Sequence, residues 1–435
     1  MIIIGDIYSL EERPKYQSIV TSMFGLASVV GPLRLILPSI PLPKSLPVIV
    51  MGGAFVANVK TRYNPSSRQL KRDLPFFLFP SDKLSWRWDF WVNLIFGGIA
   101  LTAIVLFLHI PHTSGSLGTK LKRVDVFGTL MEIATIVLLL LALNWGGNKY
   151  EWSSGPIIGL ICGAVVLFGV FCWIEGWVAI EPVIPGRLFR RPVLVLIFIC
   201  NFCLGLGFLG MLYYAPILFE VAYGTDSTGS GVRLIPLMLT LVLASGISAI
   251  FLNKVGSTQP FIIVGCALEV IGFGLFYTLD VSSSLVSQLG YLLITGAGLG
   301  LTFQNNILAA QAAADRKDMA IATGSMGGSI GIALYGSIME NTLKSEFNAL
   351  SPAVLAQAVS YGADQSYLVI SNLPDDIKPL IVRAYVNALH TVFLAGIPIA
   401  GVAFVCSLFI RTPKLVDMAR VQAEREADAM QHQEK

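Results

Sequence analysis

Long, nearly uncharged runs of apolar residues dominate the chain and are separated by short polar stretches. Each run is about twenty residues long, the length with which an α-helix crosses roughly 30 Å of hydrocarbon. Over such lengths only helices satisfy their own backbone hydrogen bonds in lipid, and a closed barrel would need alternating strands. The predicted spans are 90–110, 124–145, 156–180, 193–219, 231–252, 261–279, 285–307, 319–339 and 390–410, and a tenth begins near 18.

The composition of the chain also indicates that the lipid bilayer surrounds most of the protein. Hydrophobic residues make up 54% of the 435 positions and charged residues 13%, about half the charged share of a soluble domain. A net charge of +3 without a basic patch interleaved with aromatics excludes nucleic acid as a partner. All six cysteines lie in apolar stretches, where they behave as small hydrophobes, so we predict no disulfide framework. Nothing at the start of the chain reads as a signal peptide.

Lysine and arginine gather in alternate loops, which we therefore assign to the cytoplasm. The intervening loops are poor in cations and face outward, as does the longer, partly polar connection 345–387. The tail 413–435 then lies inside. The cationic loops carry Arg13 and Lys15; Lys120, Lys122 and Arg123; Arg187, Arg190 and Arg191; Lys254; Arg316 and Lys317; and Arg411 and Lys414.

The segment 34–83 breaks this pattern. It should face outward, yet it carries eight lysines and arginines, among them Lys60, Arg62, Arg68, Lys71, Arg72 and Lys83. It also strings together Pro38, Pro41, Pro43 and Pro47, which no continuous helix tolerates. We interpret it as an irregular insertion.

The stretch from Gly5 to Pro32, GDIYSLEERPKYQSIVTSMFGLASVVGP, resembles the cytoplasmic loop and fifth helix of fungal fourteen-helix drug/proton antiporters of the major facilitator superfamily. In that family the helix carries an antiporter motif ending in Gly-Pro-x-x-Gly-Gly, and Gly25, Gly31 and Pro32 match it. Glycines let helices approach closely, and proline permits a bend at the contact. Removing 34–51 would join Leu33 to Gly52 and Gly53 and restore the motif.

Further matches cover most of the remaining chain. They lie at the openings, ends and junctions of the helices that the family numbers six to twelve. The matching residues are Trp86, Arg87, Trp88, Asn93, Gly97 and Gly98; Asp125 and Gly128; Trp145, Gly146 and Gly147; Tyr213, Tyr214 and Pro216; Ser230, Gly231, Arg233, Leu234 and Pro236; and Gly298, Gly300, Gln304 and Gln311.

The resemblance implies an all-α polytopic membrane protein of the major facilitator fold, with an incomplete N-terminal bundle and about ten to eleven of fourteen helices. Helices one to three and most of four would precede Met1, and 34–51 and 56–81 resemble retained introns. The implied units are 1–17, the end of a truncated helix and a cytoplasmic loop; 18–112, a remnant of the N-terminal bundle with the insertion 34–83; 113–192, two linker helices; 193–412, a C-terminal helical bundle; and 413–435, a cytoplasmic tail.

Two carboxylates lie within predicted spans, Glu132 and Glu269. A charge there costs several kcal/mol, about 2.5 or more, which makes each residue a candidate for proton coupling. The alternative is an interhelical hydrogen bond or a variable residue facing a cavity. Gln304 and Gln311 are seven apart and share one helix face. With Asn305 they could line a substrate cavity, or they could bond neighbouring helices.

Other patterns carry less weight. Gly205, Gly207 and Gly210 spell G-x-G-x-x-G within a membrane helix with no strand before it, which excludes a dinucleotide site. Cys200 and Cys203 form a lone C-x-x-C without a second pair. We predict no metal, no cofactor and no enzyme.

The resemblance predicts export of an amphipathic drug, toxin or secondary metabolite, driven by protons through alternating access. The partners are then the lipid bilayer, a small-molecule substrate and protons, for a monomer in the plasma membrane, with the vacuolar membrane as the alternative. Uptake of a nutrient or siderophore, or an inactive truncated or mis-spliced protein, are the rival interpretations.

Overall fold

The computed structural model describes residues 125–178, 182, 185–314, 327–364 and 366–411, together with single positions at 13, 14, 16, 17, 94, 97, 98, 101, 102 and 106. Over these residues the fold is helical, with no strand and one isolated bridge between Gly146 and Tyr150. The prediction of an all-α membrane protein is confirmed. The antiporter motif residues and the segment 34–83 lie outside the described residues.

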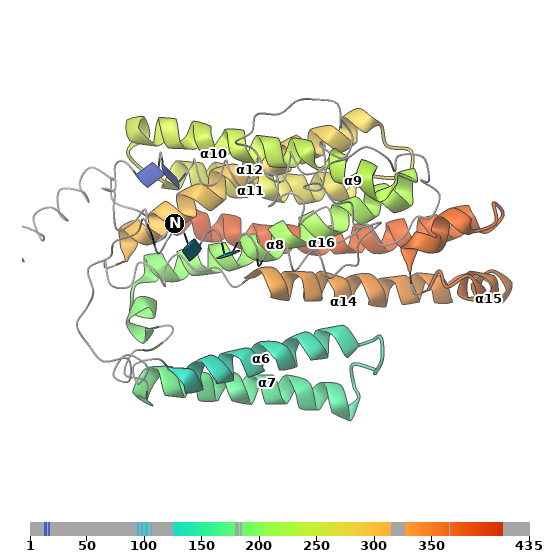
Figure 1. The fold of residues 1–435 in the computed structure, drawn as a ribbon, viewed down its shortest axis with the longest axis horizontal. Coiled ribbons are helices and arrows are strands. Elements are labelled where there is room, and N and C mark those ends of the chain that lie inside the picture. The colour runs from blue at the N-terminus through green and yellow to red at the C-terminus, as the bar shows by residue number, and fades with distance from the viewer. Residues whose placement is uncertain are drawn as a thin grey trace, which may run out of the picture.

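Two helices form a hairpin at one side of the molecule (Figure 1). Helix α6, Val126–Trp145, begins at Asp125, whose Oδ1 accepts a hydrogen bond from the Gly128 N–H at 2.7 Å and so caps the helix. Helix α7, Gly155–Trp173, continues into the π-helical turn η1, Ile174–Val178. Few of their apolar side chains are buried, as expected of helices that meet lipid.

The second unit is a bundle of long helices that lie side by side (Figure 1). Helix α12 packs against α10 and α11, α16 packs against α11 and α8, and α14 packs against α8 and α16. The bundle consists of η2 Gly186–Arg190, α8 Pro192–Tyr223, α9 Ser227–Arg233, α10 Ile235–Val255, α11 Gln259–Tyr277, α12 Leu285–Ala313, α14 Gly327–Asn348, α15 Pro352–Ser360, η4 Tyr367–Asn372 and α16 Lys378–Phe409.

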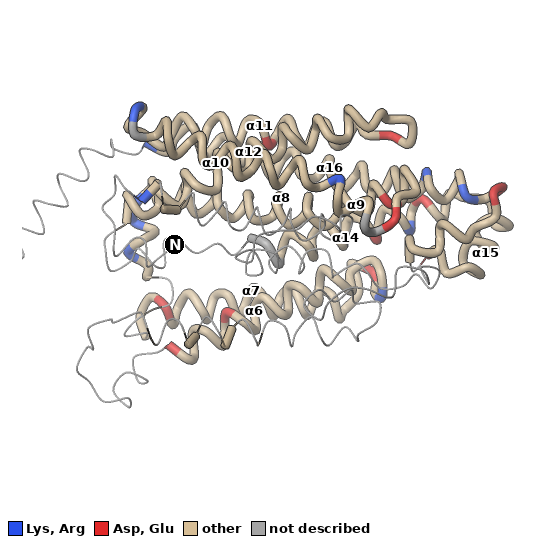
Figure 2. The backbone as a smooth tube through the Cα atoms, turned by 45° about the horizontal axis from the view of Figure 1, so that its top comes forward, with Lys and Arg blue, Asp and Glu red and all other residues tan. Residues whose placement is uncertain are grey.

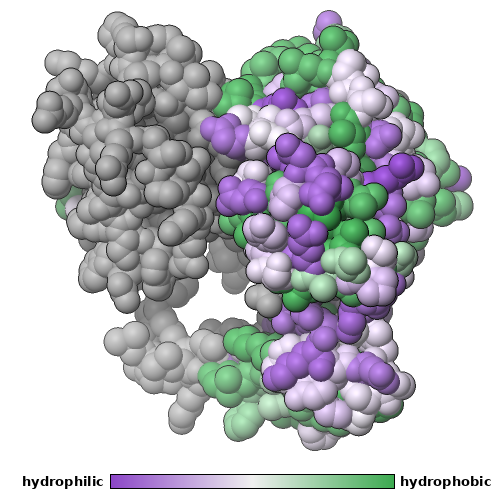
Figure 3. Space-filling view, turned by 90° about the vertical axis from the view of Figure 1, so that its right-hand side faces the viewer, coloured by the Kyte–Doolittle hydropathy of each residue, from purple (hydrophilic) through white to green (hydrophobic). Residues whose placement is uncertain are grey.

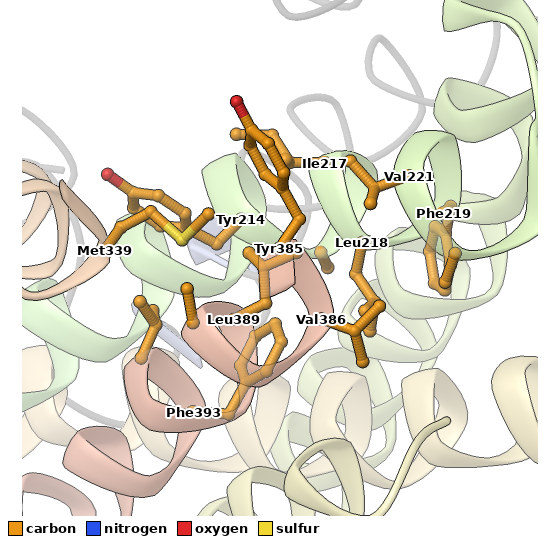
Figure 4. Packing of buried hydrophobic residues seen from close by; sticks show 14 of the residues in the cluster. Tyr214, Ile217, Leu218, Phe219, Val221, Met339, Tyr385, Val386, Leu389 and Phe393 are labelled. Atoms are coloured by element: carbon orange, nitrogen blue, oxygen red, sulfur yellow. The ribbon is translucent and has the colours of Figure 1, made fainter. Parts of the chain in front are cut away.

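The largest buried cluster draws on α8, α10, α11, α12, α14 and α16, and Figure 4 shows the part that α8, α14 and α16 contribute. Phe219, Phe276 and Phe393 form a row of tilted ring contacts, with ring centroids 6.5 Å and 5.3 Å apart. Lipid tails are as apolar as these side chains, so close packing rather than exclusion of water holds such helices together. The cluster therefore fixes how the helices are rotated against one another.

Seven helical stretches within the described ranges are long and apolar enough to cross a membrane, and they overlap seven of the predicted spans. Helix α16 starts at Lys378, twelve residues before the predicted span, and α14 runs on to Asn348. Polar residues at a helix end are solvated where the helix leaves the hydrocarbon, so apolar runs underestimate helix length.

The connection between α14 and α16, predicted as a longer, partly polar stretch, is folded against the bundle. The Tyr385 hydroxyl donates to the Ala363 carbonyl at 2.7 Å, and burial raises the pKa of Tyr367 in η4. Hydrophilic and hydrophobic residues are mixed over the described part of this end of the molecule (Figure 3). Around α15 charges of both signs mix, whereas lysine and arginine gather at the opposite end of the bundle (Figure 2).

Loops predicted on one side of the membrane contact each other. Arg191 donates from Nη1 to the Ala313 carbonyl at 2.8 Å, which joins the start of α8 to the end of α12. Both positions belong to loops predicted to face the cytoplasm.

Candidate functional site

A buried carboxyl group lies inside the bundle at the junction of α8, α11 and α12. Glu269 on α11 is 3% exposed, and its Oε1 has no hydrogen-bond partner among the described residues. The hydroxyl of Thr302 on α12 is its polar neighbour. A carboxyl group in such a place is a functional-site candidate by default.

Glycines bring α11 and α12 together beside this carboxyl group. A methyl group on Gly298 would lie 2.8 Å from the Gly265 carbonyl oxygen and 3.0 Å from Cγ of Glu269. A methyl group on Gly265 would lie 2.2 Å from the Thr302 hydroxyl. Without these glycines the two backbones could not come so close. Gly298 is one of the residues through which the sequence resembles the major facilitator pattern, and its close packing brings α12 against Glu269.

Two thiols and an amide extend the cluster. Cys200 on α8 and Cys266 on α11 have their sulfur atoms 3.8 Å apart, and Asn306 on α12 donates from Nδ2 to the Cys200 sulfur at 3.2 Å. All three side chains are fully buried, and Oδ1 of Asn306 has no partner among the described residues. We call Cys200, Cys266, Glu269, Thr302 and Asn306 the junction cluster.

Sequence reasoning singled out Glu269 and missed most of its neighbours. Cys266, Thr302 and Asn306 lie in apolar runs without any motif. Residue spacing was the one available signal. Thr302 and Asn306 are four residues apart and Cys266 and Glu269 are three apart, so each pair shares one face of its helix. Which faces meet depends on packing that the sequence pattern does not specify.

Gln304 and Gln311 lie on another face of α12 and contact the start of the chain. Nε2 of Gln17 donates to Oε1 of Gln311 at 2.8 Å. Nε2 of Gln304 reaches the Pro14 carbonyl at 3.4 Å and Oε1 of Gln17 at 3.5 Å. All three glutamines are buried. In this conformation these amides connect α12 to the N-terminal segment and do not line an open space.

The remaining candidates are not brought to the junction cluster. Asn305 is fully buried and donates to the Leu301 carbonyl of its own helix at 2.7 Å. Glu132 is half-buried on α6, in the hairpin. The structure therefore separates the two carboxylates, with Glu269 in the bundle interior and Glu132 on the hairpin.

Asp125 and Gly128 have a local role in the geometry. The carboxylate of Asp125 caps α6 at the Gly128 N–H, and a methyl group on Gly128 would lie 2.2 Å from Oδ2 of Asp125 and 2.9 Å from Oε1 of Glu175. Only glycine leaves room for both carboxylates at this helix start.

Arg233 at the end of α9 ties three helices together. Its guanidinium lies 5.8 Å from the Phe219 ring and 5.3 Å from the Tyr223 ring, and Nη1 donates to Oε1 of Gln288 on α12. Cation–π contacts and a charged hydrogen bond both suit a planar guanidinium. The arrangement lies away from the junction cluster.

In the part of the chain that the structure describes, no group of three or more histidine, cysteine or acidic side chains could hold a metal ion. The junction cluster itself offers a carboxyl group, two thiols, a hydroxyl group and one amide. Such groups exchange protons and hydrogen bonds.

Comparisons with known proteins identify relatives. Residues 75–336 match the family described as Major Facilitator Superfamily, which covers more than half of the chain. An uncharacterized MFS-type transporter of Mycobacterium tuberculosis is 29% identical over 424 residues, which are 95% of this chain and 54% of that protein. The MFS-type efflux pump MFS1 of Trichophyton rubrum is 29% identical over 94% of this chain and 70% of the pump. The chain thus spans about half of the length of the mycobacterial relatives.

Two further comparisons add detail. The Aspyridones efflux protein of Neocamarosporium betae is 27% identical over 94% of this chain and 67% of that protein. Among solved structures, a bacterial homologue of the human lysosomal transporter Spinster, inward-facing and occupied, aligns over 90% of this chain and 81% of its own with a TM-score of 0.43 and 10% identity. The helical membrane fold and the match over 75–336 together assign this chain to the Major Facilitator Superfamily.

Proposed function

We propose that this chain belongs to an efflux transporter that exports an amphipathic small molecule, a drug, toxin or secondary metabolite, in exchange for protons. Two bundles rock around a site near the middle of the membrane and open it to each side in turn. The observation that carries the proton half of the proposal is Glu269, a carboxyl group buried in a membrane helix with an unpartnered oxygen among the described residues.

The physical reason is the cost of charge in hydrocarbon. A buried carboxylate is stable only with a partner or a proton. A conformation that hydrates Glu269 favours release of its proton, and one that seals the junction cluster favours its return. Coupling follows when sealing and substrate release belong to the same conformational step.

The relatives support export as the direction. Two of them carry efflux in their names, a pump of Trichophyton rubrum and an aspyridones efflux protein. We extend to this chain the class of small amphipathic metabolites, with the plasma membrane as the site of export and the monomer as the working unit. The fourteen-helix antiporter subtype is part of the same proposal.

The experiment is transport by the chain in proteoliposomes, with rhodamine 6G and ethidium as probe cations. An imposed proton gradient should drive substrate against its concentration gradient, and a protonophore should abolish that accumulation. Flux indifferent to the proton gradient would reject antiport. A protein that inserts and folds but moves neither probe would favour the inactive-membrane-protein interpretation, and movement opposite to export would favour uptake.

A further inference from the structure

The loop between α6 and α7 is hydrogen-bonded to the C-terminal end of α14. Asn341 donates from Nδ2 to the Gly146 carbonyl at 3.1 Å, and its Oδ1 accepts from the indole Nε1 of Trp152 at 3.3 Å. Asn148 donates to Oε2 of Glu340 at 3.0 Å. Lys344 donates to the Gly147 carbonyl at 3.1 Å. We call these four hydrogen bonds the Asn341 clasp.

The loop is shaped to receive Asn341. Gly147 has a φ of +76°, and a methyl group there would lie 1.5 Å from Oδ1 of Asn341. The turn also holds itself together, because the Gly147 N–H donates to the Tyr150 carbonyl at 2.7 Å and the Lys149 N–H donates to the Trp145 carbonyl at 3.0 Å. Glycine is therefore needed twice, for the backbone conformation and for the close approach.

Asn341 is held in position from its own side as well. Its Nδ2 also donates to the Ser337 carbonyl one turn earlier in α14 at 2.7 Å. The side chain is thus fixed by its own helix before it meets the loop. Because the Asn341 side chain is hydrogen-bonded both to its own helix and to the loop, little further conformational entropy is lost when the contact forms. The contact is therefore stiff.

The clasp joins the α6–α7 hairpin to the bundle of α8 to α16. Along the chain, the hairpin is connected to that bundle through the residues that follow η1. Helix α6 also contacts α14 directly, and the four hydrogen bonds add a fixed point at the C-terminal end of α14. One packed helix face and one polar anchor define a rigid attachment, since sliding of α6 along α14 would break all four bonds at once.

We propose that the Asn341 clasp couples the α6–α7 hairpin to the C-terminal bundle, so that hairpin and bundle move as one body during transport. The inference rests on the proposed rocking cycle. The inference goes beyond that cycle, because it assigns α6 and α7 to the body that contains the C-terminal bundle.

Cysteine cross-linking tests this assignment in the full chain, with Cys162→Ala and Cys172→Ala removing the exposed native thiols. The clasp pair is Asn148→Cys with Glu340→Cys. The contrasting pair is Gln17→Cys with Gln311→Cys, which joins α12 to the N-terminal segment. Cross-linking rates are measured with copper phenanthroline in membranes, with and without an imposed proton gradient, and flux is measured before and after cross-linking.

For the clasp pair we expect the rate and the flux each to change by less than about twofold, because two parts of one body keep one relative arrangement. The contrasting pair should lose flux when cross-linked and regain it on reduction. A clasp cross-link that stops flux reversibly, or a clasp rate that follows the gradient, overturns the inference. If the uncross-linked protein has no flux, the proposed function fails, while the dependence of the clasp rate on the gradient still decides the inference.

Discussion

Gln17 donates a hydrogen bond to Gln311 across 294 positions of the chain, at a distance of 2.8 Å between Nε2 and Oε1, and both side chains are fully buried. Gln304 reaches the same Gln17 from one face of α12. The proposed rocking cycle predicts that these amide contacts between the N-terminal segment and the C-terminal bundle form in one conformation and separate in the other.

The variant Gln311→Leu should therefore shift the conformational equilibrium. Loss of one partner of a buried hydrogen bond costs about 1–3 kcal/mol, roughly 5- to 150-fold in an equilibrium. Electron–electron resonance between spin labels introduced at Tyr16 and Ser257 measures the shift as growth of a longer-distance population.

The double variant Gln17→Leu with Gln311→Leu is the matched control. Replacing both partners by apolar groups of similar shape leaves no unpaired amide at either position, and Gln304 keeps the Pro14 carbonyl as an acceptor, so the double change is nearly neutral. The distance distribution should return toward that of the parent. An unchanged distribution in the single variant would mean that the contact does not contribute to closure.

The spans could be predicted from the sequence because length and apolarity alone determine them. The junction cluster could not. Helices such as α8 and α11 are apolar on all sides, so the pattern around Cys200 and Glu269 does not tell which face is buried. The contact of Asn306 with Cys200 depends on helix rotation, which the packing of Phe219, Phe276 and Phe393 helps to fix.

Glycine at the α11–α12 crossing gives a stability prediction. In Gly298→Ala the new methyl group would meet the Gly265 carbonyl oxygen at 2.8 Å, and overpacking of this kind costs about 1–3 kcal/mol. The midpoint of thermal unfolding in detergent should fall. Gly290→Ala, on the same helix with nothing within 4 Å, should leave the midpoint unchanged or raise it, and equal midpoints for the two variants would refute the close-packing argument.

Comparing Gly147 in the clasp loop with Gly362 separates the cost of backbone strain from the cost of steric contact. Gly147 and Gly362 have nearly the same φ, +76° and +75°, but only Gly147 has Asn341 in the way. Gly362→Ala should cost about 1–2 kcal/mol for the left-handed backbone alone. Gly147→Ala should cost more, because Asn341 must also move. Urea or thermal unfolding of the two variants side by side measures the difference, and a Gly362 variant at least as unstable would contradict it.

Replacing Arg233 by lysine tests whether the shape of the guanidinium matters when the positive charge is kept. Its guanidinium faces the rings of Phe219 and Tyr223 and bonds Gln288. Lysine keeps the charge but loses the planar fork, so Arg233→Lys should lower stability by about 1–2 kcal/mol. Lys254→Arg, with its ammonium 5.6 Å from the Phe251 ring at another helix end, is the reciprocal control and should be neutral in the same thermal assay.

Glu269→Gln is the variant that bears most directly on proton coupling. Glutamine keeps the size and one acceptor oxygen of the side chain but cannot release a proton at physiological pH. Accumulation driven by a proton gradient should therefore fall by about tenfold or more, the loss of roughly 1.4 kcal/mol or more of coupling. Exchange of substrate at equal proton concentration on both sides should persist. Glu132→Gln, on the half-buried face of α6, should leave both measurements within about twofold of the parent, because a carboxylate outside the bundle interior faces a smaller change in solvation. If the Glu269 variant still accumulates substrate in response to the gradient, the coupling proton is carried by another residue.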